Sequence, residues 1–298
     1  MITEIYVIHE SFRYIDALPD EKIGSRIECM AIDWTTIKDN SDQIFKNDQI
    51  YYVELFKGRS ISDELYGDKT SRRLSRDQQV SLRKIIEYSR STELTTANII
   101  GMLPYHDIDT IRGLFYFHYE DTEDIYSIHS EKSWLRFHRH FIGVYPISEV
   151  EFLRSCIKYF GNIYIHPEVE NTLSTLEPNF KAVSIQIIRH LSALNDEFPK
   201  YHIPNNRPKS LKDFASATGC EASPEGNAAR KKDFTFAFNR VVDDKIVPEN
   251  VCCESHLKLS KSDNPGDTHY YFNRIYFHEG KEHLCDGKIL IGHIGKHL

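Results

Sequence analysis

The chain has 298 residues, of which 40% are hydrophobic and 27% charged, and its formal net charge is −7. This composition is typical of a folded globular protein long enough for two domains, and it excludes disordered and fibrous classes. The six cysteines are scattered without a C-x-x-C pair, which indicates reduced thiols. We see neither a leader peptide nor an apolar run of about eighteen residues, and therefore expect a cytoplasmic protein that does not enter a membrane.

The first half mixes strand and helix signals. Short β-branched and aromatic runs at residues 5–8, 27–32 and 50–56 predict strands. Apolar residues recurring at helical spacing predict a helix over 75–89 with Ser75 as its N-cap. Ser148, followed three residues later by Glu151, predicts a second helix start, and residues 182–194 read as a buried helix. Between these two helices, residues 161–167 form a short extended segment that ends at a proline.

A domain boundary is expected in the segment 198–208, which holds three prolines and few apolar residues. A short helix near 210–217 follows, and then Phe234, Phe236 and Phe238 at the spacing of one strand face. Residues 274–278 and 288–294 read as an antiparallel hairpin joined by a polar turn. The sequence thus predicts an α+β fold, with a mixed region at residues 1–206 and an antiparallel β-sheet domain at residues 207–298.

Polar side chains alternate with apolar ones along the last strands. Because side chains of a strand point to opposite faces in turn, the apolar residues predict a core face and the polar residues a second, shared face. These polar residues are Glu254, His256, Lys258, Arg274, Tyr276, His278, Lys296 and His297. An acid, cations and imidazoles together suit cleavage of an RNA phosphodiester by its own 2′-hydroxyl. That reaction needs a base, a cation for the phosphoryl oxygens and an acid for the leaving oxygen, and it needs neither metal nor cofactor.

Three segments of the tail, ESHLKLS, NRIYFHEG and KILIGHIGKHL, also resemble a known family. In this order they are similar to the C-terminal half of the RelE/YoeB toxin superfamily, whose members are small ribosome-dependent mRNA endonucleases. The resemblance implies Glu254 as base, Arg274 as the phosphate-binding cation and His297 as acid. We expect the other polar residues of this face to bind the substrate, namely Lys258, Lys296, Tyr276, His278 and His256.

The same resemblance implies a bacterial toxin or phage-defence effector that acts on RNA, on or off the ribosome. Residues 1–206 would then recognise a target, a protein partner or an antitoxin. The resemblance covers only the C-terminal part of the chain.

Other interpretations remain open. Arg274, Glu254 and His297 also suit a surface ion pair, an edge-strand charge and a solvated chain end. The fold could serve as a non-catalytic interaction subunit of a defence or toxin–antitoxin complex, or the first part could be a metal-dependent DNA nuclease. Vicinal Cys252 and Cys253 could bind a metal together with His256, although zinc sites usually show two spaced pairs. The aromatic and basic stretch 134–140 suits either nucleic-acid contact or a half-buried strand.

Overall fold

The computed structural model describes residues 2–16, 18–105, 109–118, 124–225, 228–242, 245–259 and 272–298. The chain forms two compact units, residues 1–138 and 139–298. Both contain helices and strands, so the α+β class is confirmed. The boundary expected at residue 206 lies inside the second unit, because the helices between 139 and 206 pack with the C-terminal strands. No helix among the described residues is long and apolar enough to span a membrane.

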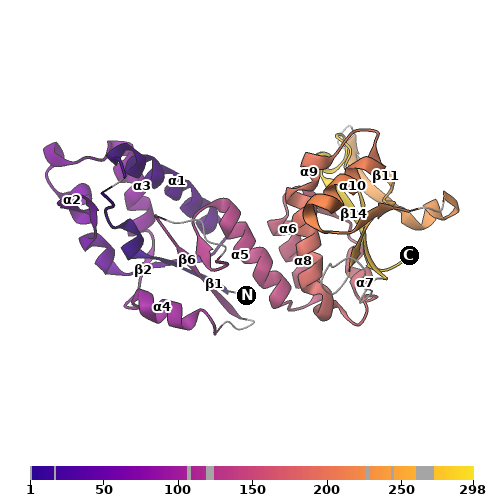
Figure 1. The fold of residues 1–298 in the computed structure, drawn as a ribbon, viewed down its shortest axis with the longest axis horizontal. Coiled ribbons are helices and arrows are strands. Elements are labelled where there is room, and N and C mark those ends of the chain that lie inside the picture. Colours follow the sequence, from indigo (N-terminus) through magenta and orange to yellow (C-terminus); the bar gives the residue numbers. More distant parts are fainter. Residues whose placement is uncertain are drawn as a thin grey trace. The chain divides into compact units, whose positions relative to one another are not determined.

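The first unit is built on a parallel sheet with the strand order β5-β2-β1-β6-β7. Its strands are β1 (Ile2–Val7), β2 (Gln43–Lys46), β5 (Arg90–Ser91), β6 (Thr110–Phe115) and β7 (Ser127–Ile128). Helices α1 (Asp20–Asp39) and α3 (Arg76–Glu87) pack together on one side of the sheet, and α4 (Thr96–Met102) lies on the other side (Figure 1). Helices on both faces explain why consecutive residues of β1, Ile5, Tyr6 and Val7, are all buried.

Several sequence predictions can be compared directly with these elements. The strand at 5–8 and the helix with Ser75 as N-cap are confirmed, and Ser75 forms a reciprocal capping box with Gln78. The strand predicted at 27–32 is wrong, because these residues lie within α1, whose buried side chains recur at helical spacing. Residues 50–56 are only partly extended, since a 3₁₀ turn, η2 (Asp48–Tyr52), precedes strand β3 (Glu54–Phe56). The strand considered for 134–140 is also wrong, because helix α5 spans Glu131–Val144.

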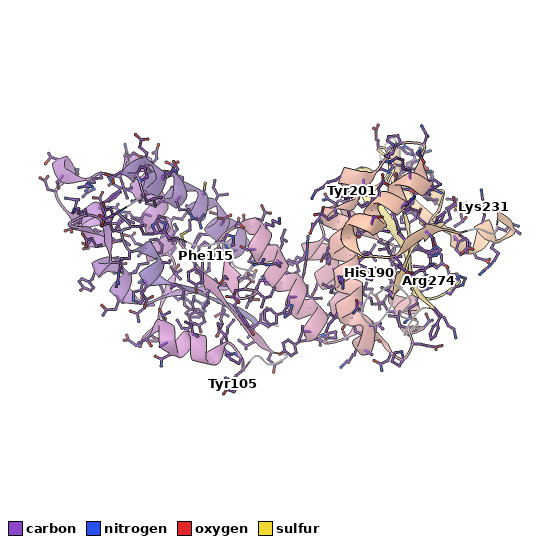
Figure 2. All side chains as sticks on the ribbon, in the orientation of Figure 1. Tyr105, Phe115, His190, Tyr201, Lys231 and Arg274 are labelled. Carbon is purple, nitrogen blue, oxygen red and sulfur yellow. The ribbon has the colours of Figure 1, made fainter. Side chains whose placement is uncertain are left out.

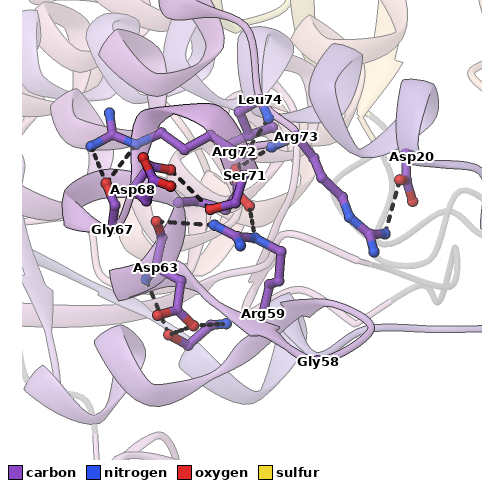
Figure 3. Close-up of polar contacts among 12 residues, drawn as sticks. Asp20, Gly58, Arg59, Asp63, Gly67, Asp68, Ser71, Arg72, Arg73 and Leu74 are labelled. Atoms are coloured by element: carbon purple, nitrogen blue, oxygen red, sulfur yellow. Dashed lines mark hydrogen bonds and ion pairs between the residues drawn. The ribbon is translucent and has the colours of Figure 1, made fainter.

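A buried carboxylate fixes the connection between α2 (Ile61–Tyr66) and α3. Glu64 is fully buried, accepts from Arg59 Nε at 2.6 Å and also accepts from the backbone N–H groups of Arg73 and Leu74. Figure 3 shows Arg59 reaching across to α2, while the side chain of Arg72 folds back onto the carbonyl of Gly67. The charge of Glu64 is therefore paired and hydrogen-bonded, as burial requires.

The second unit is built on a mixed sheet with the order β8-β14-β13-β12-β9. Its strands are β8 (Ile163–Ile165), β9 (Ala222–Pro224), β12 (Ser255–Leu259), β13 (Asn273–His278) and β14 (Ile289–Lys296). The predicted β13–β14 hairpin is antiparallel, as expected, whereas β8 runs parallel to β14. A separate hairpin, β10 (Thr235–Val242) with β11 (Lys245–Cys252), packs Phe238 into the same core as Tyr276, and Phe234, just before β10, joins that core.

Helices cover the face of this sheet opposite the β10–β11 hairpin. They include α6 (Glu149–Tyr159), α7 (Val169–Leu173), α8 (Phe180–Asp196), α9 (Phe198–Tyr201) and α10 (Arg207–Thr218), several of which gather on one side in Figure 1. The ring of Phe198 packs edge-on against Phe277 of β13 and Phe214 of α10. The helix starts at Ser148 and near 182 are confirmed. The segment 198–208, which we expected to be a connector, contains α9 and the start of α10, with residues 202–206 between them.

Two glycines of β14 allow close packing of the last strand. The register between β13 and β14 shifts after Tyr276, and a Cβ at Gly292 would lie 2.3 Å from the ring of Phe236. A Cβ at Gly295 would lie 2.5 Å from Thr175 Oγ1, just beyond α7. That hydroxyl accepts from Lys296 N at 3.0 Å, so the end of β14 is held firmly in place.

Candidate functional site

One face of the second sheet carries a row of polar side chains that spans neighbouring strands. His256 pairs directly with Tyr276, which pairs in turn with His293, and residues opposite each other in an antiparallel pair share a face. The ring centroids lie 5.3 Å apart for His256 and Tyr276 and 5.7 Å apart for Tyr276 and His293. Ser223 of β9 extends the row, with its Oγ 3.1 Å from His256 Nε2. The predicted polar face therefore exists, and it is largely buried.

Arg274 lies on the same face of β13, two residues before Tyr276. Its residue is only 4% exposed, it pairs in register with Lys258, and its Nη1 donates to the carbonyl of Asn273 at 3.0 Å. Its positive charge adds to the lowering of the His256 pKa by burial and opposes the raising of the Tyr276 pKa by burial, so the guanidinium acts on both rings. A cation is thus built into the polar row.

The end of the chain brings His297 to this face. Its backbone N–H donates to the carbonyl of Phe272 at 2.7 Å, and its ring centroid lies 6.3 Å from that of Tyr276. His297 Nε2 lies 3.9 Å from a carboxylate oxygen of Glu225, which follows β9. The side chain of His297 is 36% exposed, which makes it the accessible member of the group.

Burial sets the protonation of the imidazoles in the row. Burial first and the nearby charge of Arg274 second lower the pKa of His256 to about 4, whereas Glu225 acts in the opposite direction. Burial also lowers the pKa of His293, whose Nε2 lies 2.9 Å from the carbonyl of Lys296. His256 is therefore neutral at pH 7.

Tyr276 lies at the centre of this group. Its residue is fully buried, and the ring of Phe234 stacks on it with centroids 5.0 Å apart and an interplanar angle of 21°. Burial and then the carboxylate of Glu225 raise the pKa of Tyr276, so the phenol stays protonated and can donate a hydrogen bond. We call His256, Arg274, Tyr276, His297 and Glu225 the β13 cluster.

Glu254 is placed elsewhere. It precedes β12, and its carboxylate forms an ion pair with Arg207 at the start of α10. Arg207 also binds Glu279, which accepts from Ser255 Oγ at 3.0 Å. None of the ion pairs and hydrogen bonds found among the described residues joins Glu254 to Arg274 or His297. The structure thus brings two members of the predicted triad together and directs the third into a separate ion-pair group.

The remaining predicted residues have their own partners. His278 belongs with the Arg207 group, since its Nδ1 lies 3.9 Å from Glu279. Lys258 Nζ lies 3.9 Å from Glu221, and Lys296 Nζ lies 2.7 Å from Glu177. Both lysines lie on the strands of the sheet, but their charges are partly neutralised.

Sequence reasoning missed Glu225 and His293. His293 could have been found, because it alternates with Ile294 on a strand that was already predicted. Glu225 follows a short strand in a segment rich in Gly, Ser and Pro, and no periodic signal marks it.

The vicinal cysteines lie beside the cluster. Cys253 is buried, its thiol donates to the carbonyl of Leu290 at 3.9 Å, and burial raises the pKa of that thiol. Across the described ranges, no group of three or more His, Cys, Asp or Glu side chains is arranged to hold a metal ion.

The first unit has a second polar region, which the sequence did not predict. It lies where the parallel strands end, the edge at which open α/β sheets bind their ligands. Lys46, the last residue of β2, is almost fully buried. Its ammonium group contacts Asp48, two residues further on, and Ser91, the last residue of β5. Glu10, after β1, accepts from Thr96 Oγ1 at 2.6 Å. From β1 the chain adds β2 and β5 on one side and then β6 and β7 on the other, so the strand order reverses between β1 and β6.

Comparison of the chain with protein-family models, with curated proteins and with solved structures found no match.

Proposed function

We propose that the second unit is a metal-independent endoribonuclease of the toxin or phage-defence effector type, with the β13 cluster as its active site. The observation that carries the proposal is the convergence of His256, Arg274, Tyr276 and His297, from two strands and the chain end, on one sheet face. The chemistry of RNA cleavage requires a proton acceptor, a proton donor and a cation near one phosphodiester. This group supplies all three.

The positions of the side chains suggest a role for each. Neutral His256 would accept the proton of the attacking 2′-hydroxyl, and Arg274 would stabilise the charge that builds on the phosphoryl oxygens. His297 would protonate the leaving 5′-oxygen, with Glu225 stabilising its imidazolium form much as a carboxylate orients the histidine of a hydrolase triad. Buried Tyr276 would hold the rings of His256 and His297, which it contacts, in position. Glu225 would thus replace Glu254 as the functional carboxylate.

The test is cleavage of single-stranded RNA by the full-length chain in the presence of EDTA. We expect His297→Asn and Arg274→Gln each to reduce the rate by about 10²–10⁴-fold, the range found when a general acid or a preorganised charge is removed. The products should carry 2′,3′-cyclic phosphate ends, which mass spectrometry detects. Circular dichroism would confirm that each variant is folded.

Glu254→Gln is the matched control. Because Glu254 pairs with Arg207, this change should leave the rate within a few-fold of wild type. Loss of cleavage in Glu254→Gln with full activity in His297→Asn would overturn the assignment made here. A folded wild-type chain that cuts no RNA would favour the alternative, a non-catalytic interaction subunit of a defence or toxin–antitoxin complex.

The first unit supports a separate binding role. We infer that the carboxyl edge of its parallel sheet binds a small polar ligand, because a buried lysine and polar side chains gather there. This rests on the general behaviour of open α/β sheets. Isothermal titration with nucleotides would test it, and Lys46→Met should abolish any heat of binding. Unchanged binding in that variant would contradict the location.

A further inference from the structure

A short basic segment lies directly beside the β13 cluster. The 3₁₀ segment η4 (Ala228–Phe234) carries Arg230, Lys231 and Lys232 in succession. Figure 2 shows Lys231 on a part of the chain that projects from the second unit. The side chains of Lys231 and Lys232 are exposed, and within the described ranges neither has a carboxylate within ion-pair distance. Their charges are therefore available to a ligand.

The backbone of η4 is firmly attached to the sheet. Its last residue, Phe234, is fully buried and stacks on Tyr276, and the carbonyl of Phe234 accepts from Cys253 N at 2.7 Å. The carbonyl of Lys231 accepts from Thr235 Oγ1 at 2.7 Å. Two exposed cations are thus held on an anchored backbone, which reduces the entropy lost when they bind.

Arg230 links this segment to the cluster. Its guanidinium lies 5.5 Å above the ring of Phe234 and pairs with Asp233 at 3.2 Å. Because Phe234 in turn stacks on Tyr276, a single aromatic ring separates Arg230 from the centre of the β13 cluster.

We propose that Arg230, Lys231 and Lys232 form a phosphate-binding element that holds single-stranded RNA next to the β13 cluster. This inference rests on the proposed function and adds its substrate contact. Charge complementarity favours RNA, since successive phosphates of a single strand present the anions that exposed lysines neutralise. The chain as a whole has a net charge of −7, so binding must depend on such local groups rather than on overall charge.

The test measures binding separately from cleavage. A fluorescent single-stranded RNA is titrated with the full-length His297→Asn chain, and anisotropy is followed at several salt concentrations. Adding Lys231→Glu and Lys232→Glu should weaken binding by tenfold or more, and should reduce the slope of log K against log salt by about 1.4 for two phosphate contacts. The matched control adds Lys181→Glu and Lys212→Glu, two exposed lysines on α8 and α10. It should change the affinity by less than about twofold, since distant surface charges are screened.

Equal weakening in both double variants, or no RNA binding at all, would overturn the proposal. Equally tight binding of duplex DNA through the same lysines would overturn the assignment to single-stranded RNA. RNA binding that depends on Lys231 and Lys232, in a wild-type chain that cuts no RNA, would support this inference and reject the endoribonuclease proposal. The two proposals can therefore fail independently.

Discussion

Acidification should destabilise the second unit through His256. The pKa of this imidazole is about 4 in the fold, against 6.5 for the free side chain, because the ring is buried and lies near Arg274. The unfolded chain therefore binds the proton more tightly than the folded one. The stabilisation that this difference confers is complete above pH 6.5 and is lost as the pH falls from 6.5 towards 4. Between pH 7.5 and 5, linkage gives a loss of about 2 kcal/mol from this one residue.

The variant His256→Gln isolates that contribution. Glutamine keeps a polar partner for Ser223 but does not titrate. Between pH 7.5 and 5, the free energy of unfolding of the variant should therefore fall by about 2 kcal/mol less than that of wild type. Other groups near the ring, namely Glu225 and His293, remain in both proteins and cancel in the comparison. Ile185→Gln, at an exposed position of α8 without a titratable group, serves as the control and should keep the pH dependence of wild type.

Native-state hydrogen exchange of the β12 and β13 amides, corrected for intrinsic rates, measures the free energy of opening of the second unit. Trp34 and Trp134 both lie in the first unit, so tryptophan fluorescence follows that unit separately and should be unaffected by His256→Gln. An equal pH dependence in His256→Gln and wild type would refute the reasoning, because the imidazole would then not be buried in its neutral form.

Three further outcomes are expected. Gly292→Ala should cost about 1–3 kcal/mol in urea unfolding, because its Cβ meets an aromatic ring, whereas Gly161→Ala has open space and should cost less than 1 kcal/mol; equal costs would contradict the close packing of β14. Glu64→Ala should cost about 3 kcal/mol, since it leaves a guanidinium and two backbone N–H groups without their acceptor, and tryptophan fluorescence should report the lower midpoint. Iodoacetamide at pH 8 should label exposed Cys29 in the native chain, whereas buried Cys253, whose pKa is raised by burial, should react only after denaturation; rapid native labelling of Cys253 would show that it is not buried.

Local sequence features determined the elements that depend on near neighbours. The cap at Ser75 and the start at Ser148 were predictable because a hydroxyl satisfies a backbone N–H group only three residues away. The alternation along β12 and β13 placed Arg274 and Tyr276 on one face, because the strand period of two is a property of the backbone itself. The hairpin between β13 and β14 followed from its polar turn.

Contacts between distant residues decided the rest. The β-branched run at 27–32 became helical because it continues a long buried face of α1, and that gain outweighs local strand propensity. The strand order of the first sheet and the partner of β8 depend on pairings that no local pattern encodes. The carboxylate of the candidate site also depends on contacts between distant residues. Arg207, far from Glu254 in sequence, draws that carboxylate away, and the loop after β9 brings Glu225 to His297. Sequence alternation specifies which face a side chain occupies, but only tertiary packing determines which charges meet there.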